Sequence, residues 1–120
     1  MNKKLFISLL LVSLITGFSS CDKDFEKVMM EQFVLQTPVE IASLQACVEA
    51  HDWINAKKIA HSLKSTVSYM GLADELHPPL NEIEKAAVTQ DISAIPERFA
   101  HIKQVSERAV KEIEALLHAG

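Results

Sequence analysis

Residues 52–71 read DWINAKKIAHSLKSTVSYMG, and this stretch decides the fold class. Its apolar residues recur at spacings of three and four, which predicts an amphipathic helix. Asp52 is a favourable N-cap residue and Gly71 is a favourable residue just after a helix end, so the helix should start at Asp52 and end at about Met70. One arc of that helix forms the expected buried stripe: Ala56, Ile59, Ala60, Leu63, Val67 and Met70.

The same spacing continues on both sides of this helix, and no alternating pattern or hairpin turn indicates a strand. Four further helices are expected. The residue before a proline avoids the helical conformation, so Thr37-Pro38 should separate the first two of these helices. The His77-Pro78-Pro79 stretch should interrupt the start of the third. The expected ranges are about Asp24–Leu35, Pro38–Ala50 and Leu72–Thr89, and then a last helix from about Ser93 onward.

Short connections between helices favour antiparallel neighbours. The sequence therefore predicts an all-α protein, an antiparallel up-and-down four-helix bundle with a shorter leading helix. The inward stripe of the last helix is expected at Phe99, Ile102, Val105, Ala109, Ile113 and Leu116. Trp53 is expected in the core as well.

The first 21 residues have the layout of a secretory leader and are expected to lie outside the bundle of residues 22–120. Lys3 and Lys4 precede a largely apolar stretch from Leu5 to Ile15, and small residues precede Cys21. This layout resembles a bacterial lipoprotein signal in which Cys21 becomes the lipidated first residue. An uncleaved anchor and a start codon placed too far upstream, with Met29 or Met30 as the true start, remain alternatives.

The composition excludes several classes of protein. A chain of 120 residues fits one domain, since domains average roughly 150 residues. Beyond Cys21 the acidic residues outnumber the basic ones, which argues against nucleic-acid binding. Three glycines cannot build a Gly-rich nucleotide site. The two cysteines form no CxxC pair and the histidines lack ligand spacing, so neither a metal nor another cofactor is expected.

A second face of the helix that follows Asp52 carries polar residues around one histidine. Lys57, His61, Lys64, Ser65 and Ser68 share it, and no carboxylate of this helix lies among them. A neutral imidazole is a nucleophile, and ammonium and hydroxyl groups stabilise the oxygens of a phosphoryl group. This face therefore suits phosphoryl transfer, while an ordinary solvated helix surface is the plain alternative. Glu82 and Glu84, two positions apart, do not share a helix face and are expected to be solvated.

The stretch Ala60-His61-Ser62-Leu63-Lys64-Ser65, followed by Ser68 and Gly71-Leu72, resembles the signature of histidine-containing phosphotransfer (HPt) domains. Asp52-Trp53 matches the frequent start of the family's helix, and the likeness covers about residues 25–118. The resemblance implies that His61 accepts a phosphoryl group on its outer ring nitrogen, with Lys64 as the neighbouring cation. It also implies that the surface of Lys57, Ser65 and Ser68 docks the partners, which are receiver domains of response regulators or hybrid histidine kinases.

Two features depart from the family pattern. Ser65 replaces the usual glycine, and the prolines at 78 and 79 enter a normally continuous helix. The resemblance implies a phosphoryl carrier rather than an autonomous enzyme.

The location predicted by the leader conflicts with phosphorelay chemistry. A lipoprotein leader anchors the domain to a membrane outside the cytoplasm, whereas phosphorelay partners work inside it. A mis-set start or an unused leader would leave the domain cytoplasmic. A membrane-anchored helical lipoprotein that serves as a binding or structural module, without phosphotransfer, is the competing interpretation.

Overall fold

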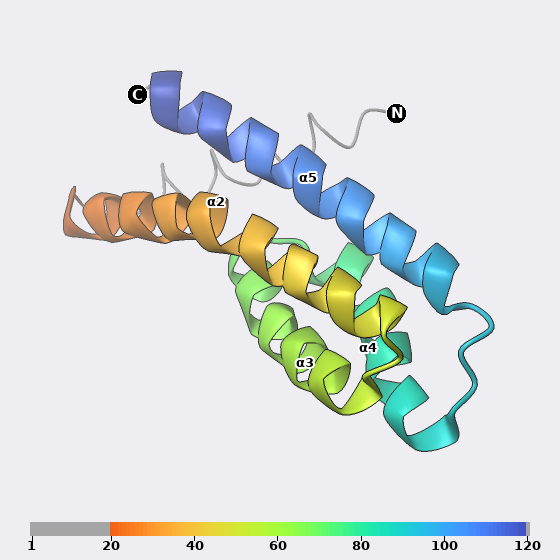
Figure 1. Cartoon of the computed structure of the whole chain (residues 1–120). Coiled ribbons are helices and arrows are strands. Elements are labelled where there is room, and N and C mark those ends of the chain that lie inside the picture. The colour runs from red at the N-terminus through yellow and green to blue at the C-terminus, as the bar shows by residue number, and fades with distance from the viewer. Residues whose placement is uncertain (1–19, 120) are drawn as a thin grey trace.

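A computed structural model describes residues 20–119 of the chain, with side chains from Asp24 onward. Four helices and no strand occur in this part: α2 (Ser20–Glu49), α3 (Trp53–Tyr69), α4 (Ala73–Thr89) and α5 (Ile95–Ala119). Both α2 and α4 pack against α3 and α5, so the four helices form a bundle (Figure 1). The all-α prediction is confirmed.

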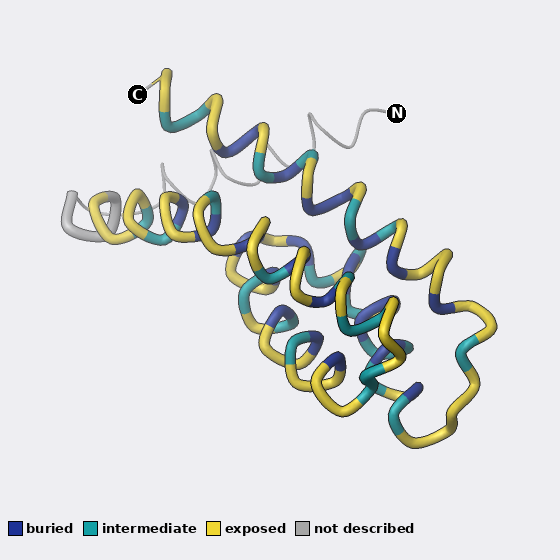
Figure 2. Tube along the Cα trace, viewed as in Figure 1, coloured by how far each residue is buried: buried dark blue, intermediate teal, exposed yellow. Residues whose placement is uncertain are grey.

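The core lies along the axis of the bundle, and every helix contributes to it (Figure 2). The predicted stripe of α3 is buried except for Ile59, which is half-buried. The predicted stripe of α5 is buried from Phe99 to Ile113, while Leu116 is half-buried against the core. Trp53 also packs against the core only in part and stacks on His51, with the ring centroids 5.6 Å apart.

The prediction of a separate leading helix is wrong, because Asp24–Leu35 and the expected second helix, from Pro38 to Glu49, both lie within the single helix α2. An interior proline removes one backbone hydrogen bond and costs about 3 kcal/mol. Buried side chains lie on both sides of Pro38 and hold the helix on the core: Met30, Phe33, Ile41 and Leu44. Their burial outweighs the cost of the proline, so the helix continues through it.

The predicted break at His77-Pro78-Pro79 is also wrong, since α4 passes through both prolines. The prolines occupy the second turn of the helix, where their fixed φ angle is already helical. Pro79 is itself buried, between the core residues Leu76 and Leu80. The continuous helix matters for the site, because it sets the face that His77 shares with later residues.

The ends of α3 agree with the sequence. The Asp52 side chain accepts a hydrogen bond from the backbone N–H of Asn55 at 3.3 Å, as an N-cap does. Beyond the helix Gly71 has a φ angle of 73°, a left-handed conformation that glycine adopts without steric cost. The turn at Gly71 brings α4 back along α3.

The predicted leader falls almost wholly outside the part of the chain that the structure describes. Residues 1–19 and the side chain of Cys21 lie outside the described part of the chain, so the lipidation of Cys21 stays a prediction. Among the described helices, none combines the length and the apolar character that crossing a membrane requires.

Candidate functional site

The predicted site residues lie together on the outer face of α3. The His61 side chain is 75% exposed, whereas that of Lys64 is 24% exposed. Lys57, Ser65 and Ser68 are exposed. The helix thus presents the imidazole to solvent and holds the ammonium group of Lys64 closer to the bundle. Side chains of the neighbouring helix α4 hold Lys64 in this position.

Glu84 of α4 reaches onto this face and contacts both central residues. Its Oε2 lies 3.1 Å from Nδ1 of His61, and its Oε1 lies 2.6 Å from Nζ of Lys64. The prediction that Glu84 is solvated is therefore wrong, since its side chain is only 16% exposed. The face carries no carboxylate of α3 itself, as expected, but α4 supplies one to it.

The charges around Glu84 keep it ionised. Burial acts to raise the pKa of its carboxyl group, but hydrogen bonds from Lys64 and His61 and their charges outweigh burial and lower the pKa. An ionised carboxylate only accepts hydrogen bonds, so Nδ1 of His61 carries the proton and its N–H donates a hydrogen bond to Oε2 of Glu84. In the neutral ring the lone pair is then on Nε2. The protein thus selects the tautomer whose free nitrogen is Nε2.

Asn81, one turn before Glu84 on α4, completes the environment of Lys64. Nζ of Lys64 donates to Oδ1 of Asn81 at 2.8 Å, in addition to its ion pair with Glu84. Two acceptors fix the position of the ammonium group beside the imidazole. A lysine held in this way is positioned before any ligand arrives and loses less side-chain entropy on binding one.

His77 closes the other end of this edge. Its Nε2 lies 3.0 Å from the backbone oxygen of Lys64 and 3.0 Å from Oγ of Ser68. The Ser68 hydroxyl in turn donates to the same carbonyl at 2.7 Å. Ser68, predicted as part of the docking surface, is therefore also joined to α4. No role of His77 was predicted from the sequence beyond its place in the His77-Pro78-Pro79 stretch.

Three residues of α4 thus face α3: His77, Asn81 and Glu84. Their spacing of four and three places them on one face of a helix, which is the signal that could have identified them. The expected interruption at Pro78 hid this signal, because a broken helix would not keep His77 in register with Glu84. We call the set His61, Lys64, Ser68, His77, Asn81 and Glu84 the polar edge.

The opposite side of α3 faces α2 and is organised differently. Glu40 of α2 receives a hydrogen bond from the Ser62 side chain. Burial raises the pKa of Glu40, and this hydrogen bond only partly offsets the effect. Further along, Ser65 borders a small hollow of about 170 Å³ between α2 and α3, which Tyr69 and Gln36 also line. The predicted docking residue Ser65 therefore stands at the rim of a surface groove.

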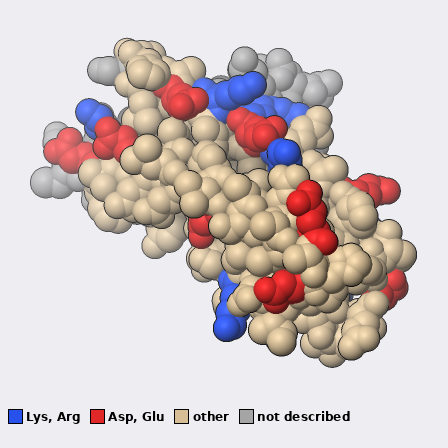
Figure 3. All heavy atoms as spheres, viewed as in Figure 1, with Lys and Arg blue, Asp and Glu red and all other residues tan. Residues whose placement is uncertain are grey.

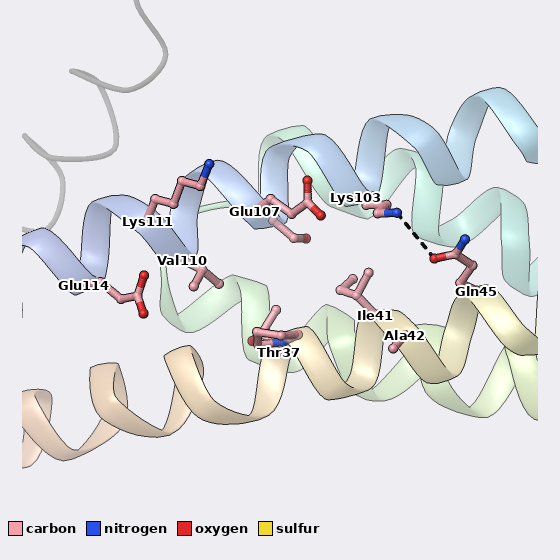
Figure 4. Close-up of a pocket in the computed structure, with 11 residues that line it drawn as sticks. Thr37, Ile41, Ala42, Gln45, Lys103, Glu107, Val110, Lys111 and Glu114 are labelled. Atoms are coloured by element: carbon pink, nitrogen blue, oxygen red, sulfur yellow. Dashed lines mark hydrogen bonds between the residues drawn. The ribbon is translucent and has the colours of Figure 1, made fainter.

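A larger hollow of about 510 Å³ lies between α2 and α5 (Figure 4). Thr37, Gln45, Lys103 and Glu114 are among its lining residues, and Lys103 donates to Gln45 across it at 3.5 Å. The Thr37 hydroxyl oxygen is buried there without a hydrogen-bond partner. None of the predicted site residues lines this hollow, so it is separate from the polar edge.

No cluster of His, Cys, Asp and Glu among the described residues is arranged to hold a metal ion.

Comparison with known proteins yields no relative. No family model matches the chain, and no curated protein and no solved structure is significantly similar to it.

Proposed function

We propose that this protein is a histidine phosphotransfer protein that relays a phosphoryl group between receiver-domain aspartates through phospho-His61. The observation that carries the proposal is the hydrogen bond from Nδ1 of His61 to Glu84 in a side chain that is otherwise 75% exposed. This bond leaves Nε2, the ring nitrogen that Glu84 does not contact, as the nucleophile. The exposed imidazole is open to a partner protein.

The transfer step balances without an added proton or cofactor. The lone pair on Nε2 attacks the phosphorus of a receiver's aspartyl phosphate, the N–P bond forms, and the P–O bond to the aspartate breaks. The aspartate leaves as a carboxylate with the electron pair of that bond. The ring keeps the proton on Nδ1 and becomes cationic, and the carboxylate of Glu84 stabilises this charge. The reverse step returns the phosphoryl group to another receiver.

The two lysines have unequal roles in this proposal. Lys64 stands three residues after His61, held in place by Glu84 and Asn81, and stabilises the oxygens of the arriving phosphoryl group. Lys57 stands a full turn before the histidine with no ion pair among the described residues, and contributes a weaker, screened attraction. Lys57, Ser65 and Ser68 form the surface on which the receiver docks.

The bundle is consistent with this function. We infer an antiparallel up-and-down arrangement of the HPt type, because residues 61, 64 and 68 of α3 pair in reverse order with 84, 81 and 77 of α4. Such a protein is a carrier and needs no nucleotide site of its own. Its phosphoryl donors and acceptors are receiver domains of response regulators or hybrid histidine kinases.

The competing proposal is a membrane-anchored helical lipoprotein that binds or supports other molecules without phosphotransfer. The leader-like residues 1–21 favour it, through lipidation of Cys21. In that case the polar edge serves only to join α3 to α4. The two proposals differ in whether His61 is ever phosphorylated.

A transfer assay separates them. Receiver domains charged with radiolabelled acetyl phosphate are incubated with the full chain, and label on the chain is tested for the acid-labile, alkali-stable behaviour of phosphohistidine. We expect label on the wild type and none on His61→Gln, with unchanged helical circular dichroism. His101→Gln, on a different helix, is the matched control and should keep the label. Label that persists in His61→Gln contradicts the proposal.

A further inference from the structure

Helix α2 differs from the other helices because it carries apolar residues on two opposite faces. One face packs on the core through Met30, Phe33, Ile41 and Leu44. The other face is exposed and holds a second row of apolar residues: Phe25, Val28, Leu35, Val39, Ala42 and Ala46. Leu35 is 72% exposed and Val39 is 65% exposed. We call this second row, together with Gln32, the α2 seam.

The spacing within the α2 seam follows the heptad pattern of a coiled coil. From position 25 to position 46 the steps are three, four, three, four, three and four residues. Apolar residues at this 3.5-residue repeat form the narrow seam along which two helices pack knobs into holes. Gln32 is the single polar member of the seam. The repeat spans three heptads of a helix that has 30 residues.

From these observations we propose that the α2 seam is the interface of a homodimer, in which α2 packs against α2 of a second copy of this chain. The inference does not rest on the proposed phosphotransfer function. Charged side chains are scarce over the middle of α2 (Figure 3), as the core of an interface requires. A stable protein interface buries roughly 1,200 Å² or more, so the two seams have to be in contact along most of their length.

The order of side-chain sizes makes the seam complementary to itself in an antiparallel pair. Phe25 then lies opposite Ala42 of the second copy, so the largest residue meets one of the smallest. Val28 lies opposite Val39, and Gln32 opposite Leu35, in layers that repeat on both sides of the twofold axis. An isologous contact of this kind closes on itself and stops at two copies.

The flanks of the seam favour a second copy over a lipid surface. Helices that lie on membranes carry Lys and Arg beside the apolar face and use a broad apolar arc. Here the flanking positions hold Asp24, Glu31, Gln36 and Ser43, with no basic residue among them. In the antiparallel pair Glu31 lies near Pro38 of the second copy and Asp24 near Gln45, so like charges do not face each other.

The dimer leaves the polar edge free. The α2 seam points away from the core on α2, whereas His61 contacts α4 from the far side of α3. Both copies of His61 thus stay exposed in the pair. The dimer accordingly doubles the number of polar edges without covering either one.

Sedimentation equilibrium of the full chain in density-matched mild detergent tests the proposal. We expect a dimer for the wild type and at least a 100-fold weaker dimer for Leu35→Glu, because the variant buries an unpaired charge in the seam. Val88→Glu is the matched control, since Val88 is 75% exposed on α4 and outside the seam. Val88→Glu should dimerise as the wild type does. All three proteins carry the same leader, so any association through the leader contributes equally to each and cancels when their affinities are compared. Circular dichroism verifies that each variant is folded.

An exchange of side chains tests the pairing. Ala42→Phe places two phenylalanines in one layer and should weaken the dimer at least tenfold. The double variant Phe25→Ala/Ala42→Phe again has one large and one small residue in that layer, and should return to within about threefold of the wild type. A double variant as weak as Ala42→Phe overturns the antiparallel pairing. A monomeric wild type, or equal affinities for wild type and Leu35→Glu, overturns the dimer, as does seam-dependent binding of the monomer to lipid vesicles.

Discussion

The two edges of α3 both receive a glutamate from a neighbouring helix, yet the structure treats these glutamates in opposite ways. On the α4 side, Glu84 meets an ammonium group and an imidazole, and its pKa is lowered. On the α2 side, burial raises the pKa of Glu40, and the hydrogen bond from Ser62 only partly offsets this effect. A hydroxyl stabilises a carboxylate less than an ammonium group does.

Two ionisable groups of α3 are paired with a carboxylate on its α4 side. Lys64 and His61 share one carboxylate within 3.1 Å, so three ionisable groups form one unit. The α2 side has no such unit. If the protein transfers phosphoryl groups, changes on the α4 side should affect the rate, whereas matched changes on the α2 side should not.

The largest effect is expected from removal of the carboxylate that orients His61. Glu84→Ala frees the imidazole to adopt the other tautomer and leaves the ring cation unstabilised. For metal-bound histidines, loss of the carboxylate that orients the ring costs about 10–100-fold, and we expect a similar factor for an imidazole nucleophile. We therefore expect the initial rate of label transfer from a phosphorylated receiver to fall by that factor.

Glu40→Ala is the matched control for this prediction, because it removes the same side chain from the other edge of α3. It should transfer at roughly the wild-type rate. Equal losses in the two variants would show that the carboxylates act only on folding, and no loss in Glu84→Ala would remove Glu84 from the mechanism.

A smaller difference is expected between the two lysines. Lys64→Ala removes the held ammonium group and should slow transfer roughly tenfold, while Lys57→Ala, at an exposed and screened position, should slow it less than about threefold. Rates measured at low and at high salt sharpen the comparison, since the Lys57 effect should disappear at high salt. The assignment of Lys64 is wrong if the two variants have the same rate.

Much of this site could be predicted from the sequence, because its residues on α3 follow from helical periodicity. The face with Lys57, His61, Lys64, Ser65 and Ser68 depends only on spacing within one helix, and the structure keeps those residues on one face. The ends of α3 at Asp52 and Gly71 are local signals as well. The ends of α3 and the shared face of these five residues were therefore predicted correctly, while their roles stay a prediction.

Features that depend on contacts between helices were missed. The prolines at 38, 78 and 79 predicted helix boundaries by local rules, but core packing on both sides of each proline overrides the local cost. Glu84 was placed at the surface for the same reason, since the partner that holds it lies 20 residues earlier on α3. Local sequence carries no direct record of that pairing.

The smallest expected effect is the pH dependence of stability, which has opposite signs at the two glutamates. Glu84 has a lowered pKa in the folded state, so its stabilising contribution is present above the unfolded value of about 4.3 and is lost as the pH falls through the folded value. Glu84→Gln should therefore lower the free energy of unfolding by about 1 kcal/mol at neutral pH, and by less in acid.

Glu40 has a raised pKa, so the folded state binds its proton more tightly and ionisation at neutral pH is unfavourable. Glu40→Gln should raise stability at neutral pH by a smaller amount, and this gain should also shrink toward pH 4. Urea unfolding followed by circular dichroism at both pH values measures the differences, and changes of the same sign in the two variants would contradict the contrast between the two edges.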